Sequence, residues 1–399
     1  MVDDKLALDG ITVLDLGQVY NGPYCSLLLA HLGAHVIKVE PIDGEHTRRR
    51  SPQPEPYPLI LLNSNKDGLG LNLKSGQGRR LFLDLVATAD IVVENFAEGV
   101  LERLGCGWDE LQSANPRVIL ASGRGFNDHG GWGGVPAMDL AVQALGGVLA
   151  VTGFADGPPV KCGGAVADIL GGTTLAVAAL AALHERERTG RGQHVSVPML
   201  DATLPTLTSP LAGYLETGGT LPERTGNRHG GLEVAPYNVY RCKDGWMTVF
   251  CAREQHWRAL ATTLGHPELV EADGFSSMRS RAQNMDEVDD LVTAWTTQRS
   301  RAEASAALLA QGVPCAPVRG IGELLDDAGL RDSGALPEVE HATRGRVRAF
   351  GSPFHVRGRK PRPLVPAPTL GQHSRDVLHS RLDLSGDDID RLLTEGVIA

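Results

Sequence analysis

One stretch near the N-terminus decides the fold: Gly10-Ile-Thr-Val-Leu-Asp-Leu-Gly17, then Asn21-Gly-Pro23, then His35-Val-Ile-Lys-Val-Glu40. The first and last segments are short and apolar, as buried parallel strands are. Proline just after Asn21 is typical of a first helical turn, and the apolar residues from Tyr24 to Leu32 continue with helical periodicity until Gly33. A strand, a helix and a strand in this order predict a right-handed βαβ unit.

The same alternation of strands and helices continues downstream. Further strands are predicted at 69–73, 90–95, 117–122 and 194–199, and helices at 76–88, 108–114, 138–148 and 173–184, whereas the polar, proline-rich stretch 48–58 is predicted to be a loop. The pattern favours an α/β fold with a Rossmann-like large domain, whose ligand crevice lies at the carboxyl ends of the strands. Glu40 stands where a ribose-binding acid would stand, but the turn 17–22 is not Gly-x-Gly-x-x-Gly, which disfavours a nicotinamide-dependent dehydrogenase.

The composition changes near residue 220 and suggests a second domain. Residues 224–232 read as a glycine-rich loop, 237–251 as a hairpin turning at Lys243-Asp-Gly245, and 254–311 as short amphipathic helices. We therefore expect residues 1–224 to form the N-terminal part of the large domain, 225–325 an inserted smaller α+β domain, and 326–399 a segment that returns to the large domain.

The totals are those of an ordinary globular protein, with 42% hydrophobic and 22% charged residues among 399. A formal net charge of -10 argues against a nucleic-acid partner and against a polybasic membrane patch. We expect a cytoplasmic protein without a membrane segment, because the first residues do not resemble a signal peptide. The six cysteines show no Cys-x-x-Cys spacing, so we expect reduced thiols and no metal site.

A lone carboxylate stands out in Gly163-Gly-Ala-Val-Ala-Asp168-Ile-Leu-Gly-Gly172, directly before the apolar run 173–184. An aspartate in this place is commonly an N-cap, which accepts backbone N–H groups and matches the positive end of the helix dipole. The alternative is chemistry, because small neighbours leave the carboxylate open to a bulky ligand. The segment by itself favours capping.

Several motifs in order and spacing resemble the family III CoA-transferases, a group that also contains the α-methylacyl-CoA racemases. The motifs that carry the resemblance are 8–15, Gly22-Pro23, 32–40, Val93-Glu-Asn-Phe96, 115–122, 153–159, the Asp168 segment and 180–193. The resemblance runs essentially from end to end. It implies an interlaced homodimer that takes an acyl-CoA donor and a small carboxylic acid acceptor.

The resemblance also implies the mechanism. Asp168 matches the family's catalytic aspartate, which attacks the donor thioester to give a mixed anhydride and then an aspartyl-CoA thioester. No metal is required, and backbone N–H groups of Gly230 and Gly231 are candidates to stabilise the tetrahedral oxyanion. His229 beside them is a candidate for the acceptor carboxylate; the alternative is an ordinary exposed loop histidine.

Coenzyme A needs cations for its phosphates. Lys74 and Arg103 match positions that contact the nucleotide end in the family, and Arg48 and Arg50 are candidates by position alone. For each of these four residues the alternative is a solvated surface charge.

Other positions depart from the family's patterns. Tyr20, Arg50 and Met138 stand where formyl-CoA transferases carry Gln, Trp and Tyr, and the glycine loop is shortened to 230–233. Since these positions shape the acyl pocket, they disfavour formyl and oxalate as the acids. Racemases carry a histidine at the position of Met138, and methionine cannot shuttle a proton, so an isomerase is the second hypothesis. Asp139 either orients a group near the thioester or caps a helix. A non-catalytic acyl-CoA-binding protein is the third hypothesis.

Overall fold

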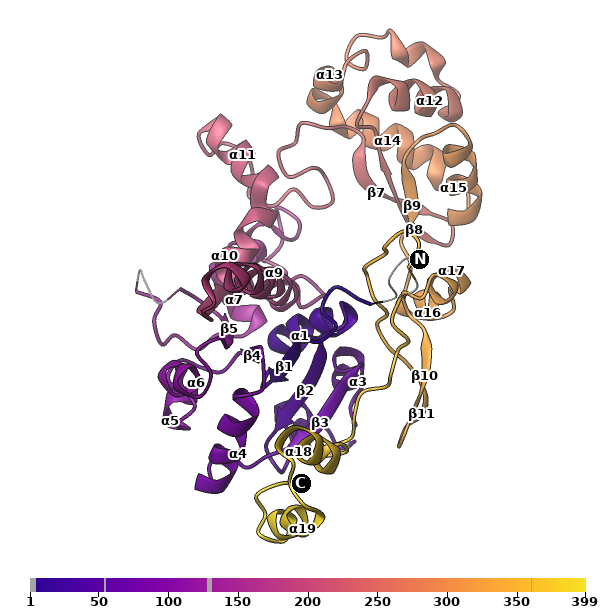
Figure 1. Ribbon diagram of the computed structural model, residues 1–399. Helices are drawn as coiled ribbons and strands as arrows, with labels where there is room; N and C mark the ends of the chain where they lie inside the picture. Colours follow the sequence, from indigo (N-terminus) through magenta and orange to yellow (C-terminus); the bar gives the residue numbers. More distant parts are fainter. Residues whose placement is uncertain (1–4, 54, 128–130, 360) are drawn as a thin grey trace. The chain divides into compact units, whose positions relative to one another are not determined.

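The computed structural model describes residues 5–53, 55–127, 131–359 and 361–399. The chain forms two compact units (Figure 1). The first unit comprises Met1–Val142, Gly164–Thr203 and Asp327–Ala399, and the second comprises Gln143–Gly163 and Leu204–Asp326. The stretch 225–325, which we expected to be an inserted domain, thus lies within the second unit, and that unit begins earlier in the chain.

A six-stranded parallel sheet forms the centre of the first unit, in the order β3-β2-β1-β4-β5-β6. Its strands are β1 (Thr12–Asp15), β2 (His35–Glu40), β3 (Lys66–Gly70), β4 (Ile91–Glu94), β5 (Ile119–Arg124) and β6 (His194–Pro198). Val13 in β1 is paired with Val36 on one side and Ile91 on the other. The strand order reverses between β1 and β4, and in a Rossmann-like sheet ligands bind at such a point. The predicted α/β class is confirmed.

Helices cover both faces of the sheet because neighbouring residues of each strand point to opposite sides. Leu14 packs in a core with α4 (Gly76–Val86), α6 (Trp108–Ala114), α18 (Ser374–Leu382) and α19 (Gly386–Thr394). Val13 packs in the opposite core with α1 (Asn21–His31) and α9 (Val166–Thr189). The two C-terminal helices therefore complete the first unit.

Helix α9 is the long core helix of the first unit and ends at Gly190, whose φ is 71°. Among the described residues it is the one helix whose length and composition would suffice to cross a membrane. Its buried side, however, packs on α1 and the sheet through Leu175, Ala179 and Leu183. The close approach to α1 needs glycine, since a Cβ at Gly172 would lie 2.5 Å from the carbonyl oxygen of Asn21.

Two predictions of local structure were wrong. The stretch 48–58 is not a loop throughout, because α2 (His46–Arg50) and α3 (Tyr57–Leu62) border and enter it. Arg48 of α2 is buried between Glu40 and Glu55, and α3 buries an apolar side. The third strand is 66–70 rather than 69–73, since a buried lysine begins it. Both errors involve buried charges whose ion-pair partners the sequence pattern does not reveal.

The second unit contains its own sheet and core. A three-stranded antiparallel sheet has the order β7-β8-β9, and the hairpin predicted at Lys243-Asp-Gly245 joins its first two strands. The elements of the unit are α8 (Val148–Val151), η1 (Leu204–Leu207), α11 (Thr208–Thr217), β7 (Tyr237–Cys242), β8 (Gly245–Phe250), α12 (Glu254–Leu264), η2 (Pro267–Val270), α13 (Met278–Gln283), α14 (Met285–Thr296), α15 (Arg301–Ala310), β9 (Cys315–Pro317) and α16 (Ile321–Leu325). Trp257 is at the centre of its apolar core.

The remaining elements are short. They are α5 (Val100–Arg103), α7 (Asp139–Leu145), α10 (Met199–Thr203), α17 (Ala328–Asp332), β10 (Glu338–His341) and β11 (Gly345–Arg348), the last two forming an antiparallel pair.

A buried ion pair ties the carboxyl end of β1 to the start of β3. The Lys66 ammonium lies 2.9 Å from the Asp15 carboxylate, and both side chains are fully buried. The same ammonium donates to the Ser26 hydroxyl at 2.8 Å and to the Asn63 amide oxygen at 2.8 Å. Burial alone would raise the pKa of Asp15, but the charges of Lys66 and Lys38 hold that pKa below its usual value. The aspartate is therefore ionised in the folded chain.

Replacing Lys66 tests how much this pair stabilises the first unit. Lys66→Met should lower the free energy of unfolding by about 3–5 kcal/mol, because it leaves the Asp15 charge buried without its main partner. Urea denaturation measures the change. The exposed pair Arg375 with Asp390 provides the control, and Arg375→Met should cost less than about 1 kcal/mol. Equal losses in both variants would contradict this role of Lys66.

Candidate active site

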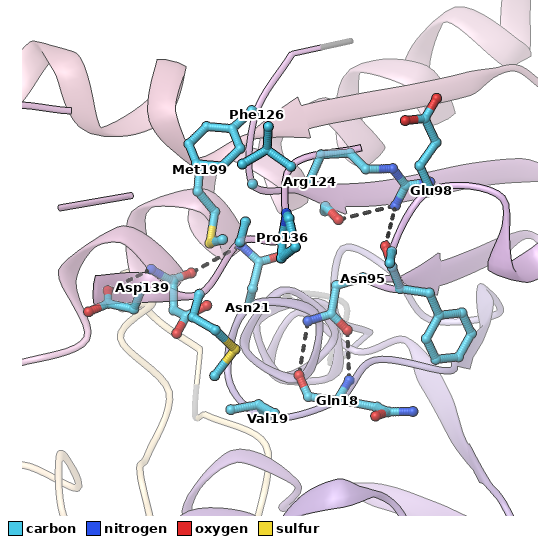
Figure 2. A pocket seen from close by; sticks show the side chains of 18 of the residues that line it. Gln18, Val19, Asn21, Asn95, Glu98, Arg124, Phe126, Pro136, Asp139 and Met199 are labelled. Carbon is cyan, nitrogen blue, oxygen red and sulfur yellow. Dashed lines mark hydrogen bonds between the residues drawn. The ribbon is translucent and has the colours of Figure 1, made fainter. Parts of the chain in front are cut away.

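A cavity of about 400 Å³ opens at the carboxyl ends of β1, β4 and β5 in the first unit (Figure 2). The turn after each strand contributes to its wall, together with the segment before α7 and the start of α9. The lining residues are Gln18, Val19, Asn21, His46, Asn95, Phe96, Ala97, Glu98, Gly123, Arg124, Gly125, Phe126, Trp132, Gly134, Val135, Pro136, Ala137, Met138, Asp139, Asp168 and Met199. The cavity lies where a sheet of this order is expected to bind its ligand.

The turn after β1 is fixed by side chains from other segments. Asn95, after β4, accepts the Gln18 N–H at 2.7 Å and donates to the Gln18 carbonyl at 2.9 Å, as Figure 2 shows. Val19 has a φ of 63°, which is uncommon for a β-branched residue. Its N–H faces the Glu45 carboxylate at 3.3 Å. These contacts hold the turn in a conformation that its own residues do not favour.

Asp168 lies in the first turn of α9, and the capping interpretation is wrong. Ala165 occupies the N-cap position, and no side-chain hydrogen bond is made there. Instead Asp139, at the start of α7, accepts the N–H of Ala167 at 2.8 Å and that of Asp168 at 3.3 Å (Figure 2). Asp139 thus performs the helix capping that we weighed as one of its two roles. Asp168 is one of the residues that line the cavity.

The environment of Asp168 changes its acidity. Burial raises the pKa of Asp168, the Asp139 carboxylate raises it further, and the result is a pKa of about 7. Desolvation and a like charge are two of the ways in which proteins raise the pKa of a carboxyl group. Such a carboxylate is more basic than an ordinary aspartate and is still largely ionised in mildly alkaline solution.

A second cavity of about 420 Å³ adjoins the first, since Gln18 and Phe96 line both. Its walls are mainly apolar, with Val39, Leu71 and Leu73 among the lining residues. Lys74 also lines it and is exposed. The carboxylates Glu40, Asp43 and Glu45 line it as well, and Lys74 is the one lysine or arginine among the described lining residues.

The predicted coenzyme A cations fall in different places. Arg103 is exposed at the end of α5, whose neighbours Val100 and Leu104 line the second cavity. Arg50 is exposed at the end of α2 and lines neither cavity. Arg48 is buried and binds the Glu40 carboxylate at 2.7 Å as well as Glu55. A phosphate would have to displace a carboxylate to reach Arg48, so we do not place Arg48 in the coenzyme A site.

Of the other two positions that depart from the family's patterns, one lines the first cavity and one does not. Met138 lines the first cavity and is 57% exposed. Tyr20 is the N-cap residue of α1 and does not line the cavity, although Val19 and Asn21 on either side of it do. Glu40, which we compared with a ribose-binding acid, is buried against Arg48.

The loop predicted to stabilise an oxyanion belongs to the second unit. The Gly231 N–H donates to Nδ1 of His229 at 3.2 Å, and the His229 ring packs edge-on against Tyr237 with 5.5 Å between ring centroids. Gly230 packs against Pro210. His229 is therefore in contact with neighbours inside its own unit.

Sequence reasoning missed the pair Gln18 and Asn95, and it named helix capping as one role of Asp139 without identifying the helix as α9. Asn95 lies in the motif 93–96 that we quoted for the resemblance, so that motif was the available signal. Among the described residues no group of three or more His, Cys, Asp or Glu side chains could hold a metal ion.

Comparison with known proteins agrees with this geometry. The pattern that defines CoA-transferase family III matches residues 8–374. The protein is an enzyme of the CoA-transferase class, and the chain belongs to CoA-transferase family III. The resemblance that we described from the motifs is confirmed.

Relatives of nearly full length are similar to this chain. A succinyl-CoA:mesaconate CoA-transferase of Haloarcula marismortui is 37% identical, over 93% of this chain and 96% of that protein. A formyl-CoA:oxalate CoA-transferase of Streptomyces coelicolor is 33% identical, over 98% of this chain and 99% of that protein. The crystal structure of a CAIB/BAIF family protein from Brucella suis superposes with a TM-score of 0.82 at 30% identity, over 94% of this chain and all of that one.

The raised pKa of Asp168 predicts a pH-dependent stability. Between the usual pKa of 3.8 and about 7, the folded chain keeps a proton that the unfolded chain has lost. The free energy of unfolding therefore falls as the pH rises through this window. Asp168→Asn should remove this fall and be more stable than the wild type at pH 8, by on the order of 1 to 4 kcal/mol, and nearly equal to it at pH 4.

Asp139→Asn separates the two causes of the shift. The amide oxygen can still accept the N–H groups of Ala167 and Asp168, but the negative charge is gone, so the pKa of Asp168 should fall. Urea denaturation of both variants and the wild type between pH 4 and 8 measures the differences. Parallel pH profiles for wild type and Asp168→Asn would show that Asp168 titrates normally.

Proposed function

We propose that this enzyme transfers coenzyme A from an acyl-CoA donor to a carboxylic acid acceptor through a covalent bond to Asp168. The observation that carries the proposal is the position of Asp168. Its carboxylate does not cap α9, because Asp139 does so, and its pKa is about 7. It lines a cavity at the point where the strand order of the sheet reverses.

The proposed reaction begins with attack of the Asp168 carboxylate on the donor thioester carbonyl. The C–S bond breaks, coenzyme A leaves as the thiolate, and the acyl group forms a mixed anhydride with Asp168. The thiolate then attacks the aspartyl carbonyl carbon, which releases the donor acid as a carboxylate and leaves an aspartyl-CoA thioester. The raised pKa of Asp168 supports this role, because basicity favours nucleophilic attack.

The second half reverses these steps with a new acid. The acceptor carboxylate attacks the aspartyl thioester, the thiolate leaves, and a second mixed anhydride forms. The thiolate then attacks the acceptor acyl carbon, which gives the new acyl-CoA and restores the Asp168 carboxylate. We propose Gly230 and Gly231 as oxyanion donors and His229 as a group that receives the acceptor. For Gly231 this requires release of its N–H from His229.

The adjoining cavities support a binding mode for coenzyme A. We place the thioester at Asp168 in the first cavity and the nucleotide end in the second. Lys74 lines the second cavity, and Arg103 directly precedes the lining residue Leu104. Arg50 is a further candidate for the phosphates. No metal takes part in these steps.

We also propose the interlaced homodimer that the resemblance implies, and a cytoplasmic location. Apolar side chains on α7 and on α9 support a partner, since Leu145 and Val177 are 47% and 61% exposed. An isomerase is disfavoured, because Met138 lines the cavity where a proton-transferring histidine would be required.

Covalent labelling tests the proposed function. The enzyme is incubated with an acyl-CoA, quenched with hydroxylamine and digested, and mass spectrometry should find the hydroxamate at Asp168. Asp168→Asn should lack both the label and the transferase activity, with a loss of at least about 10³-fold. Asp139→Asn keeps the nucleophile and should still be labelled. An unlabelled Asp168 with normal turnover would refute the covalent route, and bound but unreacted acyl-CoA would favour a binding protein.

The second cavity gives a separate prediction. Lys74→Ala should raise the KM for acyl-CoA by about tenfold with little change in kcat, because the lost contact is to a part of the substrate that does not react. Arg80→Ala is the matched control, since Arg80 is also exposed and lines neither cavity. Steady-state kinetics measure both, and equal KM values in the two variants would remove Lys74 from the site.

A further inference from the structure

The wall of the first cavity near Asp168 is apolar. Phe126 and Met199 pack in one buried cluster with Ala167, the residue before Asp168. Trp132 extends the cluster, with its ring centroid 5.6 Å from that of Phe126. Figure 2 shows Phe126 and Met199 on the same side of the cavity as Asp139. Phe126, Trp132 and Met199 all line the same cavity as Asp168.

The polar part of the wall carries mainly negative charge. Asp139 and Glu98 line the cavity together with Asp168. Among the described lining residues Arg124 is the only lysine or arginine. Its guanidinium lies 2.7 Å from the buried Glu94 carboxylate, and the same nitrogen donates to the Gly123 carbonyl at 3.1 Å. The positive charge of Arg124 is therefore already paired with the negative charge of Glu94. His46 also lines the cavity, and it is exposed.

These surroundings discriminate between classes of acid. A second carboxylate on the acyl group would be transferred from water to a site walled by aromatic and thioether side chains. It would also come close to the negative charge of Asp139. Burying a charge without a partner is costly, and like charges at short range repel. An aliphatic or aromatic acyl group instead gains about 25 cal/mol per Å² of apolar surface that it buries.

We propose that the enzyme acts on the coenzyme A thioester of an apolar monocarboxylic acid, held by Phe126, Trp132, Met138 and Met199. The inference rests on the proposed function and names its substrate class. It separates this chain from the relatives named for succinyl-CoA, mesaconate and oxalate, whose acids carry two carboxyl groups.

A matched pair of donors tests the proposal. Succinyl-CoA and 4-methylpentanoyl-CoA have acyl groups of the same chain length and similar shape, with a carboxylate in one and an isopropyl group in the other. We expect kcat/KM for formation of the Asp168 intermediate to be at least about tenfold higher with 4-methylpentanoyl-CoA. Equal values, or a preference for succinyl-CoA, would overturn the proposal while the label at Asp168 would still uphold the proposed function.

Failure of the proposed function would look different. If neither donor, nor any member of a broad panel of aliphatic, aromatic and dicarboxylic acyl-CoAs, labelled Asp168, the covalent route itself would be refuted, and the inference with it.

A charge introduced in the wall tests the same point from the protein side. Met138→Arg should raise kcat/KM for succinyl-CoA relative to 4-methylpentanoyl-CoA by about tenfold or more, because it supplies the missing cation. Leu140→Arg is the control: Leu140 has similar exposure, 53% against 57%, but does not line the cavity. The control should leave the donor ratio unchanged. An unchanged ratio in Met138→Arg would remove Met138 from the acyl site and contradict the proposal.

Discussion

The buried ion pair of Lys66 and Asp15 is the interaction on which the site depends. Asp15 uses its other carboxylate oxygen to accept the Gly17 N–H at 2.8 Å, and Lys38 donates to the Gly17 carbonyl at 2.9 Å. The pair therefore fixes the backbone directly before Gln18, which lines both cavities. Because these charges lie outside water, the geometry is strongly constrained. The buried hydrogen-bond network of Asp15, Lys38 and Lys66 thus positions the turn that lines both cavities.

Asp168 in the first turn of α9 and Asp139 at the start of α7 divide two tasks that one carboxylate cannot perform together. A capping carboxylate is stabilised as an acceptor of backbone N–H groups, which lowers its basicity. Asp139 takes that task from a different segment of the chain, and its charge raises the pKa of Asp168. Close packing of Gly172 against α1 holds the helix that carries Asp168. Asp168 is thus positioned by residues of other segments of the chain.

The sequence predicted those features that depend on local pattern. Apolar runs and the proline after Asn21 were enough to predict the parallel strands and α1. The segment around Asp168 by itself favoured capping, and only its place among the family's motifs made Asp168 the candidate nucleophile. Pairings between distant residues were not predictable. The run of three arginines that begins at Arg48 is typical of a solvated loop. Only the structure shows that Arg48 pairs with Glu40 and Glu55. Lys66 likewise reads as polar, although it is fully buried at the start of β3. A buried charge is recognised only with its partner, and the partner lies elsewhere in the chain.

The division of the site explains how one reaction can serve different acids. Every donor shares coenzyme A, so in the proposed binding mode the second cavity and Asp168 meet the part of the substrate that does not vary. The acyl group varies, and in the same binding mode it faces the segment from Trp132 to Met138. The side chains of Trp132, Val135 and Met138 are exposed and are not part of the buried core. Exposed positions change with little effect on stability, whereas the buried network around Lys66 does not tolerate change. Membership of the family indicates the class of reaction, and on our proposal the acid is chosen by a wall that can vary independently of the fold.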